Sequence, residues 1–178
     1  MREIIKDRQV VQDDWTVLTL AEGETAETVA IPAGKVIVPL GVWQQQAAIR
    51  NRGDVGVWLA SNERPEVLKE NINAIPVIAV DFPKFADGRG YSIAYNLRAR
   101  LGYQGEVRAI GDVLRDQLFY MQRVGFNAFA TRPDRNIHDA LKGLTDFSEA
   151  YQTSWDRKNP LFRRVARDHL NPQGQANG

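Results

Sequence analysis

The chain has no cysteine among its 178 residues. Disulfide bonds, thiolate nucleophiles, redox dithiols and cysteine-ligated iron–sulfur clusters are therefore excluded for this chain. Only two histidines are present, His138 and His169, and they lie too far apart in sequence to indicate a histidine-rich metal site. We predict no metal centre, and any redox chemistry would require a bound cofactor or a partner protein.

A large charge of one sign and a long hydrophobic run are also missing. The formal net charge is +1, so no global field would recruit nucleic acid or an anionic membrane. No apolar run approaches the length of a membrane span, and residues 1–12 lack the apolar centre of a signal peptide. We expect a cytoplasmic protein that binds neither nucleic acid nor membranes.

Apolar segments alternate with helical patterns through most of the chain. The expected strands are 36–40, 55–60, 76–81, 106–110 and part of 126–131, and the expected helices between them are 42–50, 64–68, 92–100 and 112–124. Such alternation with short connections predicts an α/β fold of about five mainly parallel strands. An open three-layer sheet is favoured over a partial barrel, because eight units close the usual barrel.

The two ends of the chain differ from this pattern. Apolar pairs at 4–5 and 10–11 flank a polar turn and, together with 15–18, predict an N-terminal antiparallel hairpin or meander. We predict one domain over 1–151, with the hairpin and a loop in 1–30 and the alternating units in 35–151. Its last helix is expected to be capped by Asp134. The polar tail 152–178 is expected to be partly disordered.

A glycine-containing stretch follows the third strand. It carries the candidate ligand-binding residues Asp81, Lys84, Asp87, Gly88, Arg89, Gly90 and Ser92. Glycine lets a ligand approach the main chain, and a helix N-terminus attracts anions, so this loop is a candidate site for phosphate, sulfate or sulfite. The alternative, weighed equally, is that the glycines only form a tight turn.

The fourth strand and the turn after it supply the other candidates. These are Arg108, Asp112, Arg115, Asp116 and Gln117. Ligands of parallel α/β proteins bind at the carboxyl ends of the strands, and arginines bind oxyanions bidentately. We therefore predict that Arg89 and Arg115 face a shared pocket. Asp112 is also a natural N-cap of the following helix.

Three segments carry a resemblance to a known family. Phe-Pro-Lys-Phe-Ala-Asp-Gly-Arg-Gly-Tyr-Ser (82–92), Gly-Glu-Val-Arg-Ala-Ile-Gly-Asp-Val-Leu-Arg-Asp-Gln (105–117) and Gly-Phe-Asn-Ala-Phe (125–129) resemble the bacterial domain-of-unknown-function family 934. Its members are commonly labelled probable oxidoreductases of sulfite reduction, and their genes often neighbour that of the sulfite reductase haemoprotein. The resemblance implies a role in assimilatory sulfur metabolism.

Two functions from different classes follow from these observations. The first is an accessory protein or partner of the sulfite reductase haemoprotein that binds a small oxyanion. The second is an oxidoreductase that uses a bound flavin or nicotinamide, although the glycine spacing in 88–90 matches neither a Walker A loop nor the dinucleotide fingerprint. A binding module outside sulfur metabolism is a third, plainer interpretation.

Overall fold

The computed structural model describes residues 2–83 and 88–145. Its strands are β1 (Arg2–Lys6), β2 (Gln9–Asp13), β3 (Thr16–Val17), β4 (Val36–Pro39), β5 (Val55–Leu59), β6 (Val77–Phe82), β7 (Glu106–Gly111) and β8 (Ala128–Phe129). Its α-helices are α1 (Leu40–Gln45), α2 (Arg89–Tyr95), α3 (Arg115–Val124) and α4 (Ile137–Leu141). Short 3-10 helices are η1 (Ala47–Asn51), η2 (Pro65–Ala74) and η4 (Lys142–Thr145), and η3 (Asn96–Arg100) is π-helical.

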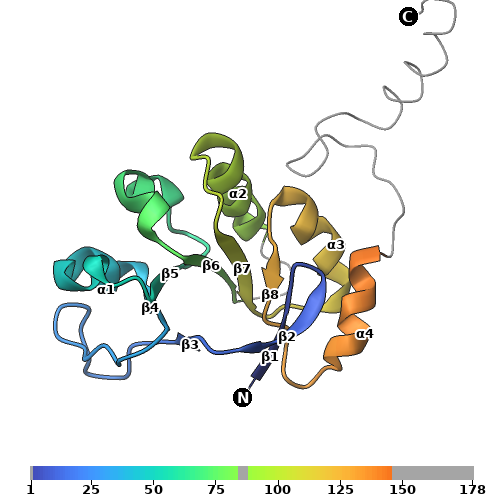
Figure 1. The fold of residues 1–178 in the computed structure, drawn as a ribbon, viewed down its shortest axis with the longest axis horizontal. Coiled ribbons are helices and arrows are strands. Elements are labelled where there is room, and N and C mark those ends of the chain that lie inside the picture. The colour runs from blue at the N-terminus through green and yellow to red at the C-terminus, as the bar shows by residue number, and fades with distance from the viewer. Residues whose placement is uncertain (1, 84–87, 146–178) are drawn as a thin grey trace, which may run out of the picture.

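All eight strands form a single sheet in the order β2-β1-β8-β7-β6-β5-β4-β3. The strands from β3 to β8 are parallel to their neighbours, whereas β1 is antiparallel to both β8 and β2. Only Asp14 and Trp15 separate β2 from β3, so the two edge strands of the sheet are consecutive in the chain. The sheet is therefore curled into a half-barrel whose edges are joined by this short connection (Figure 1).

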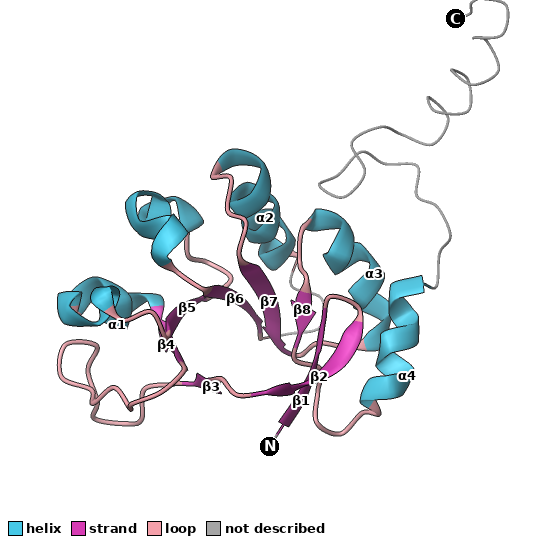
Figure 2. Ribbon diagram, viewed as in Figure 1, coloured by secondary structure: helices cyan, strands magenta, loops and turns pink. Residues whose placement is uncertain are grey.

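The helices lie on the convex side of the curled sheet (Figure 2). From β3 to β8 the parallel strands are neighbours in chain order, without the reversal that sends helices to the other face of a doubly wound sheet. Right-handed crossovers in one direction then place every helix on the same side. The mainly parallel α/β sheet is thus confirmed, whereas the favoured open three-layer arrangement is wrong and the partial barrel is what forms.

The N-terminal hairpin exists but is part of the main sheet. Ile4 lies opposite Val11 and Ile5 opposite Val10, and the turn residues Asp7 and Arg8 have positive φ angles of 50° and 67°. Residues 15–18 do not extend the hairpin as an antiparallel meander. Instead β3 pairs in parallel with β4, because the chain continues from β2 in the same direction to the other sheet edge.

The two faces of the sheet have different compositions. Val36, Val57, Ile78, Val80 and other convex-face residues are buried in the main apolar core beneath the helices. The concave face holds a smaller apolar cluster, made by Ile4, Ile37, Val77, Ala79, Ile110 and Ala130. It also carries charged side chains, which are described below. The strict alternation of the two sets along each strand follows from the period of two in a β-strand.

Two predicted helix caps are wrong. Helix α3 begins at Arg115 and is capped through Gln117, whose Oε1 accepts from the backbone N–H of Leu114. Asp112 lies before the helix because Gly111, with a φ of 94°, turns the chain at the end of β7. Asn136, rather than Asp134, caps α4 and accepts from the backbone N–H groups of His138 and Asp139. The predicted end of this domain and its tail, 146–178, lie outside the described residues.

Candidate functional site

The first of two cavities at the carboxyl end of the parallel strands lies on the concave face. We call it the mouth cavity; its volume is about 250 Å³. It is lined by Arg2, Asp13, Val17, Thr19, Trp58, Asp81, Arg108, Ile110, Gly111 and Ala130. These residues come from β1, β2, β3, β5, β6 and β7 and from the segments just after β3 and β8, so the curl of the sheet itself creates the cavity.

Arg108 is a buried charged residue of the mouth cavity, with 1 % of its surface exposed. Its Nε donates to Glu106 Oε2 at 2.7 Å, and its Nη1 donates to both carboxylate oxygens of Asp13 at 3.0 and 3.1 Å. Glu106 in turn pairs with Lys6 at 3.2 Å. A buried ion pair carries a desolvation penalty that is offset only by good geometry and further hydrogen bonds, and this arrangement supplies them.

The rim of the mouth cavity is also held by specific contacts. Arg2 lies directly opposite Asp13 in the β1–β2 pairing, and its Nη2 donates to the carbonyl oxygen of Thr131 at 3.0 Å. The indole Nε1 of Trp58 donates to the carbonyl oxygen of Leu18 at 2.9 Å, which fixes the ring. Asp81, from the end of β6, also lines the cavity. The cavity therefore presents two arginines and two aspartates beside an indole ring.

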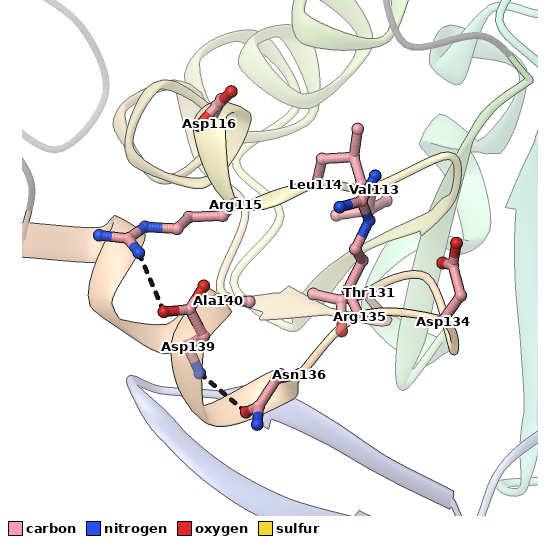
Figure 3. A pocket seen from close by; sticks show the side chains of 10 residues that line it. All are labelled: Val113, Leu114, Arg115, Asp116, Thr131, Asp134, Arg135, Asn136, Asp139 and Ala140. Atoms are coloured by element: carbon pink, nitrogen blue, oxygen red, sulfur yellow. Dashed lines mark hydrogen bonds and ion pairs between the residues drawn. The ribbon is translucent and has the colours of Figure 1, made fainter.

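The second cavity is a groove between the start of α3 and the segment that leads from β8 into α4. We call it the α3–α4 groove; its volume is about 500 Å³. It is lined by Val113, Leu114, Arg115, Asp116, Thr131, Asp134, Arg135, Asn136, Asp139 and Ala140. Figure 3 shows these side chains, which come from the segments after two neighbouring parallel strands, β7 and β8, and from the helices α3 and α4 into which those segments lead.

Ion pairs organise the charged residues around the α3–α4 groove. Arg115 Nη1 donates to Asp139 Oδ1 at 3.1 Å (Figure 3). Arg132 binds Asp134 through Nε and Nη2, and Asp112 through Nη1. The hydrogen bond from Arg132 lowers the pKa of Asp134 below its ordinary value of 3.8, so this carboxylate is ionised at neutral pH.

Arg135 differs from these paired arginines. It is exposed and lines the groove, and no side-chain hydrogen bond or ion pair of Arg135 is found in the described part of the chain. Asp139 and Asp134 are already engaged by Arg115 and Arg132. The guanidinium of Arg135 is therefore the cation of the groove with the most hydrogen-bonding capacity left.

The glycine-containing stretch has a different character from the one expected. Gly88 has a φ of −76°, which any residue adopts, whereas a methyl group on Gly90 would lie 2.5 Å from the ring of Phe82. Gly90 is thus required for the close packing of α2 on β6. Arg89 and Ser92 are exposed on α2, and Lys84 and Asp87 lie outside the described residues.

The ligand-binding residues predicted from the sequence therefore lie in different places in the structure. Asp81 and Arg108 line the mouth cavity, and Arg115 and Asp116 line the groove. Arg89 lines neither cavity, so the structure does not bring it together with Arg115 in these two sites. Asp112 and Gln117 border the groove through their contacts with Arg132 and Leu114.

Sequence reasoning missed Arg2, Asp13 and Trp58 in the mouth cavity and Asn136 in the groove. The signal for the first two was the alternation of charged and apolar residues in the hairpin, which places Arg2 and Asp13 on one face with Ile4 and Val11. The sequence does not indicate that the hairpin pairs with the main sheet, so this alternation could not be linked to the cavity. For Trp58 there was no signal beyond its place near a strand end.

Two further classes of site are absent from residues 2–83 and 88–145. No group of three or more histidine, aspartate or glutamate side chains there is arranged to hold a metal ion. No helix in those ranges has the length and apolar character needed to cross a membrane.

The fold and the two cavities define an α/β half-barrel protein with charged cavities at the carboxyl ends of its strands. Residues 56–162, more than half of the chain, match the family described as "Bacterial protein of unknown function (DUF934)". The chain belongs to this family. No curated protein and no solved structure matches it.

Proposed function

We propose that the protein binds a small oxyanion in the α3–α4 groove and acts as an accessory or partner protein of sulfite reduction. The observation that carries the proposal is the placement of Arg115, at the start of α3, and Arg135, in the segment before α4, after two neighbouring parallel strands. In complete α/β barrels, the loops at this end of the last strands commonly form phosphate sites. The link to sulfite reduction comes from the family resemblance in residues 82–129.

The groove offers an oxyanion several hydrogen-bond donors. Arg135 supplies a guanidinium, and the hydroxyl of Thr131 and the first turn of α3, at the positive end of the helix dipole, lie along the same cavity. Arg115 is held by Asp139, and this pair positions one edge of the groove. Because Asp134 and Asp139 are paired with arginines, their repulsion of a bound anion is reduced.

Calorimetric titration with sulfite and with sulfate tests the anion site. We expect Arg135→Gln to weaken binding about tenfold or more, since a hydrogen bond to a charged group contributes about 1.5–3 kcal/mol. Arg100→Gln is the matched control, because Arg100 is an exposed arginine at the end of η3 that lines neither cavity. Equal binding by the wild type and Arg135→Gln would refute the site.

The partnership with sulfite reductase needs its own experiments. A pull-down of the sulfite reductase haemoprotein with the full chain should recover a complex, and deletion of the gene should make cells require cysteine or sulfide. Growth on sulfate without impairment, together with no association, would contradict this part of the proposal and leave the anion site to be judged by titration.

The alternative function is an oxidoreductase that binds flavin or nicotinamide. The observation in its favour is the size of the groove, since about 500 Å³ falls within the range of small-molecule and cofactor sites. An absorbance spectrum of the purified protein and titrations with FMN and NADPH distinguish the two functions. A colourless protein with no nucleotide affinity would leave the oxyanion-binding function alone.

A further inference from the structure

The mouth cavity is a separate site from the α3–α4 groove. The two share no lining residue, and the mouth cavity lies inside the curl of the sheet whereas the groove lies between helices. Its volume of about 250 Å³ is below the range that accommodates drug-sized ligands, so it fits a small molecule. A ligand of the mouth cavity is therefore independent of the anion proposed for the groove.

Arg108 keeps hydrogen-bonding capacity at the surface of this cavity although it is almost fully buried. Glu106 holds its Nε and Asp13 holds its Nη1, whereas Nη2 makes no hydrogen bond among the described residues. Nη2 is not one of the polar atoms of those residues that are enclosed without a partner, so it reaches the cavity surface. A guanidinium in one fixed orientation thus presents two N–H donors to the molecule that occupies the cavity.

The two carboxylates of the cavity lining are already engaged. Both oxygens of Asp13 accept from Arg108 Nη1, and Asp13 Oδ1 also accepts from the backbone N–H of Trp15 at 3.1 Å. Asp81 has an interaction partner as well. The charged groups of the lining with hydrogen bonds left to make are therefore the arginines, so a ligand has to bring acceptors.

Arg2 adds a second guanidinium at the rim of the cavity. Its Nη2 donates to the carbonyl oxygen of Thr131 at 3.0 Å, and its Nε and Nη1 make no hydrogen bond in the described part of the chain. The β1–β2 pairing sets Arg2 opposite Asp13, which itself binds Arg108, so both guanidiniums border the same cavity. A carboxylate accepts stronger, charge-assisted hydrogen bonds from such donors than a neutral group does.

The formal charge of the lining favours a singly charged anion. Arg2 and Arg108 are balanced by Asp13 and Asp81, so the formal charge of the lining is zero. One negative charge on the ligand would be met by the donors of the two arginines. A second negative charge would add repulsion from the aspartates and find no further cation in the lining.

Much of the remaining cavity surface is apolar. Val17, Ile110 and Ala130 line it together with the Trp58 ring, whose orientation is fixed by the hydrogen bond to Leu18. A bare oxyanion would leave this wall uncovered, whereas a short carbon chain would gain from its burial there. We propose that the mouth cavity binds a small monocarboxylate, with its carboxylate on the two guanidiniums and its carbon chain against the apolar wall.

The test uses the full chain, with propionate as the probe and with acetate, propionamide and sulfate as comparisons. The indole N–H signal of Trp58 in a ¹⁵N–¹H correlation spectrum, assigned by its absence in Trp58→Phe, reports binding in the mouth cavity, and its titration gives the affinity. Propionate should shift this signal and bind about fourfold more tightly than acetate, which is the effect of one buried CH₂ group. Propionamide, which lacks the charge, and sulfate, which lacks the carbon chain, should bind at least tenfold more weakly.

Four results would overturn the proposal. Propionate that leaves the Trp58 signal unchanged would show that it does not bind in the mouth cavity. Propionamide that binds as tightly as propionate would show that the arginines do not recognise a charge. Sulfate that binds as tightly would make the cavity a general oxyanion site, and equal binding of acetate would show that the apolar wall takes no part.

Variants assign the binding to named residues. Arg2→Gln should weaken propionate binding about tenfold, because a charge-assisted donor is lost from the rim. Arg100→Gln, at an exposed arginine outside the lining, is the matched control and should bind propionate as the wild type does. Thr19→Trp should block the cavity from its rim, whereas Thr16→Trp, which changes an exposed residue of β3 outside the lining, should not. Thr19→Trp decides the question if Arg2→Gln does not fold, and unchanged propionate binding in either folded variant would overturn the proposal.

The groove variant Arg135→Gln separates this proposal from the function proposed for the groove. It should leave propionate binding unchanged, because Arg135 does not line the mouth cavity. Sulfite binding that is equal in Arg135→Gln and the wild type would refute only the groove site, provided that propionate still shifts the Trp58 signal. Loss of propionate binding in Arg135→Gln would show that the probe binds in the groove and would overturn the assignment to the mouth cavity.

Discussion

Two buried arginines, Arg98 and Arg108, serve different purposes in this fold. Arg98, with 6 % of its surface exposed, donates to the carbonyl oxygens of Tyr103, Gly105 and Gly125, all within 2.8–2.9 Å. Arg108 donates to carboxylates and lines a cavity. Burial lowers the pKa of Arg98 below its ordinary value, but the guanidinium remains charged at neutral pH.

The two arginines are both buried, and they differ in their hydrogen-bond partners. Backbone carbonyls cannot move away or change their charge, so Arg98 joins the loop before β7 to the end of α3 and uses its donors to do so. Carboxylates on β2 and β7 hold Arg108 in one orientation and leave Nη2 without a hydrogen bond among the described residues. A buried arginine is therefore a ligand-binding candidate only if its contacts leave donors for a ligand.

The largest effect is expected from Arg108→Met. Removal of the guanidinium leaves Asp13 buried without its ion-pair partner and Glu106 with Lys6 alone, and breaking a buried ion pair in this way costs about 3–5 kcal/mol. Urea unfolding measures the change. Adding Asp13→Asn and Glu106→Gln to Arg108→Met should recover a substantial part of the lost free energy of unfolding. If Arg108→Met alone were as stable as the wild type, the ion pairs of Arg108 would not contribute to the stability of the fold.

Arg98→Ala should destabilise the protein by about 2–4 kcal/mol, since three carbonyls lose a charged donor and each unsatisfied acceptor costs on the order of 1 kcal/mol or more. Arg98→Lys should recover less than half of this, because an ammonium cannot reproduce the planar fork. Titration of sulfite should be unaffected in the folded fraction. If Arg98→Ala were as stable as the wild type but bound ligand more weakly, Arg98 would be a ligand-binding residue and not a structural one.

The two glycines that flank Arg89 allow a matched test of whether Gly90 is needed for packing. Gly90→Ala should cost about 1–3 kcal/mol, because the added methyl group would overlap the ring of Phe82. Gly88→Ala should be close to neutral, because Gly88 has an ordinary φ and no atom within 4 Å of the new methyl group. Thermal unfolding compares the two. Equal stability of both variants would contradict the packing role of Gly90.

Much of the sheet was predictable because each parallel strand is a short apolar run between helical patterns. The predicted strands 36–40, 55–60 and 106–110 agree with β4, β5 and β7 to within one residue at either end. The curl was not predictable, since it depends on β3 pairing with β4 over only two residues, Thr16 and Val17. No local pattern indicates which edge of a sheet so short a strand joins.

The candidate sites were predictable in part, for a related reason. Arg108 and Asp81 were found because strand ends of parallel sheets meet at one edge, a rule that applies before the strand order is known. Arg2 and Asp13 were missed because their place in the cavity depends on the antiparallel pairing of β1 with β8. The Asp112 cap was wrong because Gly111 displaces the helix start by three residues and leaves Asp112 to bind Arg132.

The smallest effect is expected from two solvent-accessible Arg-x-Asp pairs, Arg52–Asp54 just before β5 and Arg132–Asp134 after β8. In both, the arginine lowers the pKa of the aspartate below 3.8. A lowered pKa stabilises the fold at pH values above the ordinary pKa, and the contribution is lost as the pH falls through the lowered one. Because the side chains of Asp54 and Asp134 are 40 % and 57 % exposed, Asp54→Asn and Asp134→Asn should leave the unfolding midpoint at pH 7 almost unchanged.

The two variants should nevertheless differ in ligand binding. Asp134 lines the α3–α4 groove and Asp54 does not, so only Asp134→Asn removes a negative charge beside a bound anion. It also releases two donors of Arg132, whose remaining partner is Asp112. We therefore expect Asp134→Asn to bind sulfite a few-fold more tightly than the wild type, because a solvent-screened pair of like charges costs on the order of 1 kcal/mol. Asp54→Asn should bind sulfite as the wild type does. Weaker binding in Asp134→Asn would mean that the Arg132–Asp134 pair positions the groove rather than opposing its ligand.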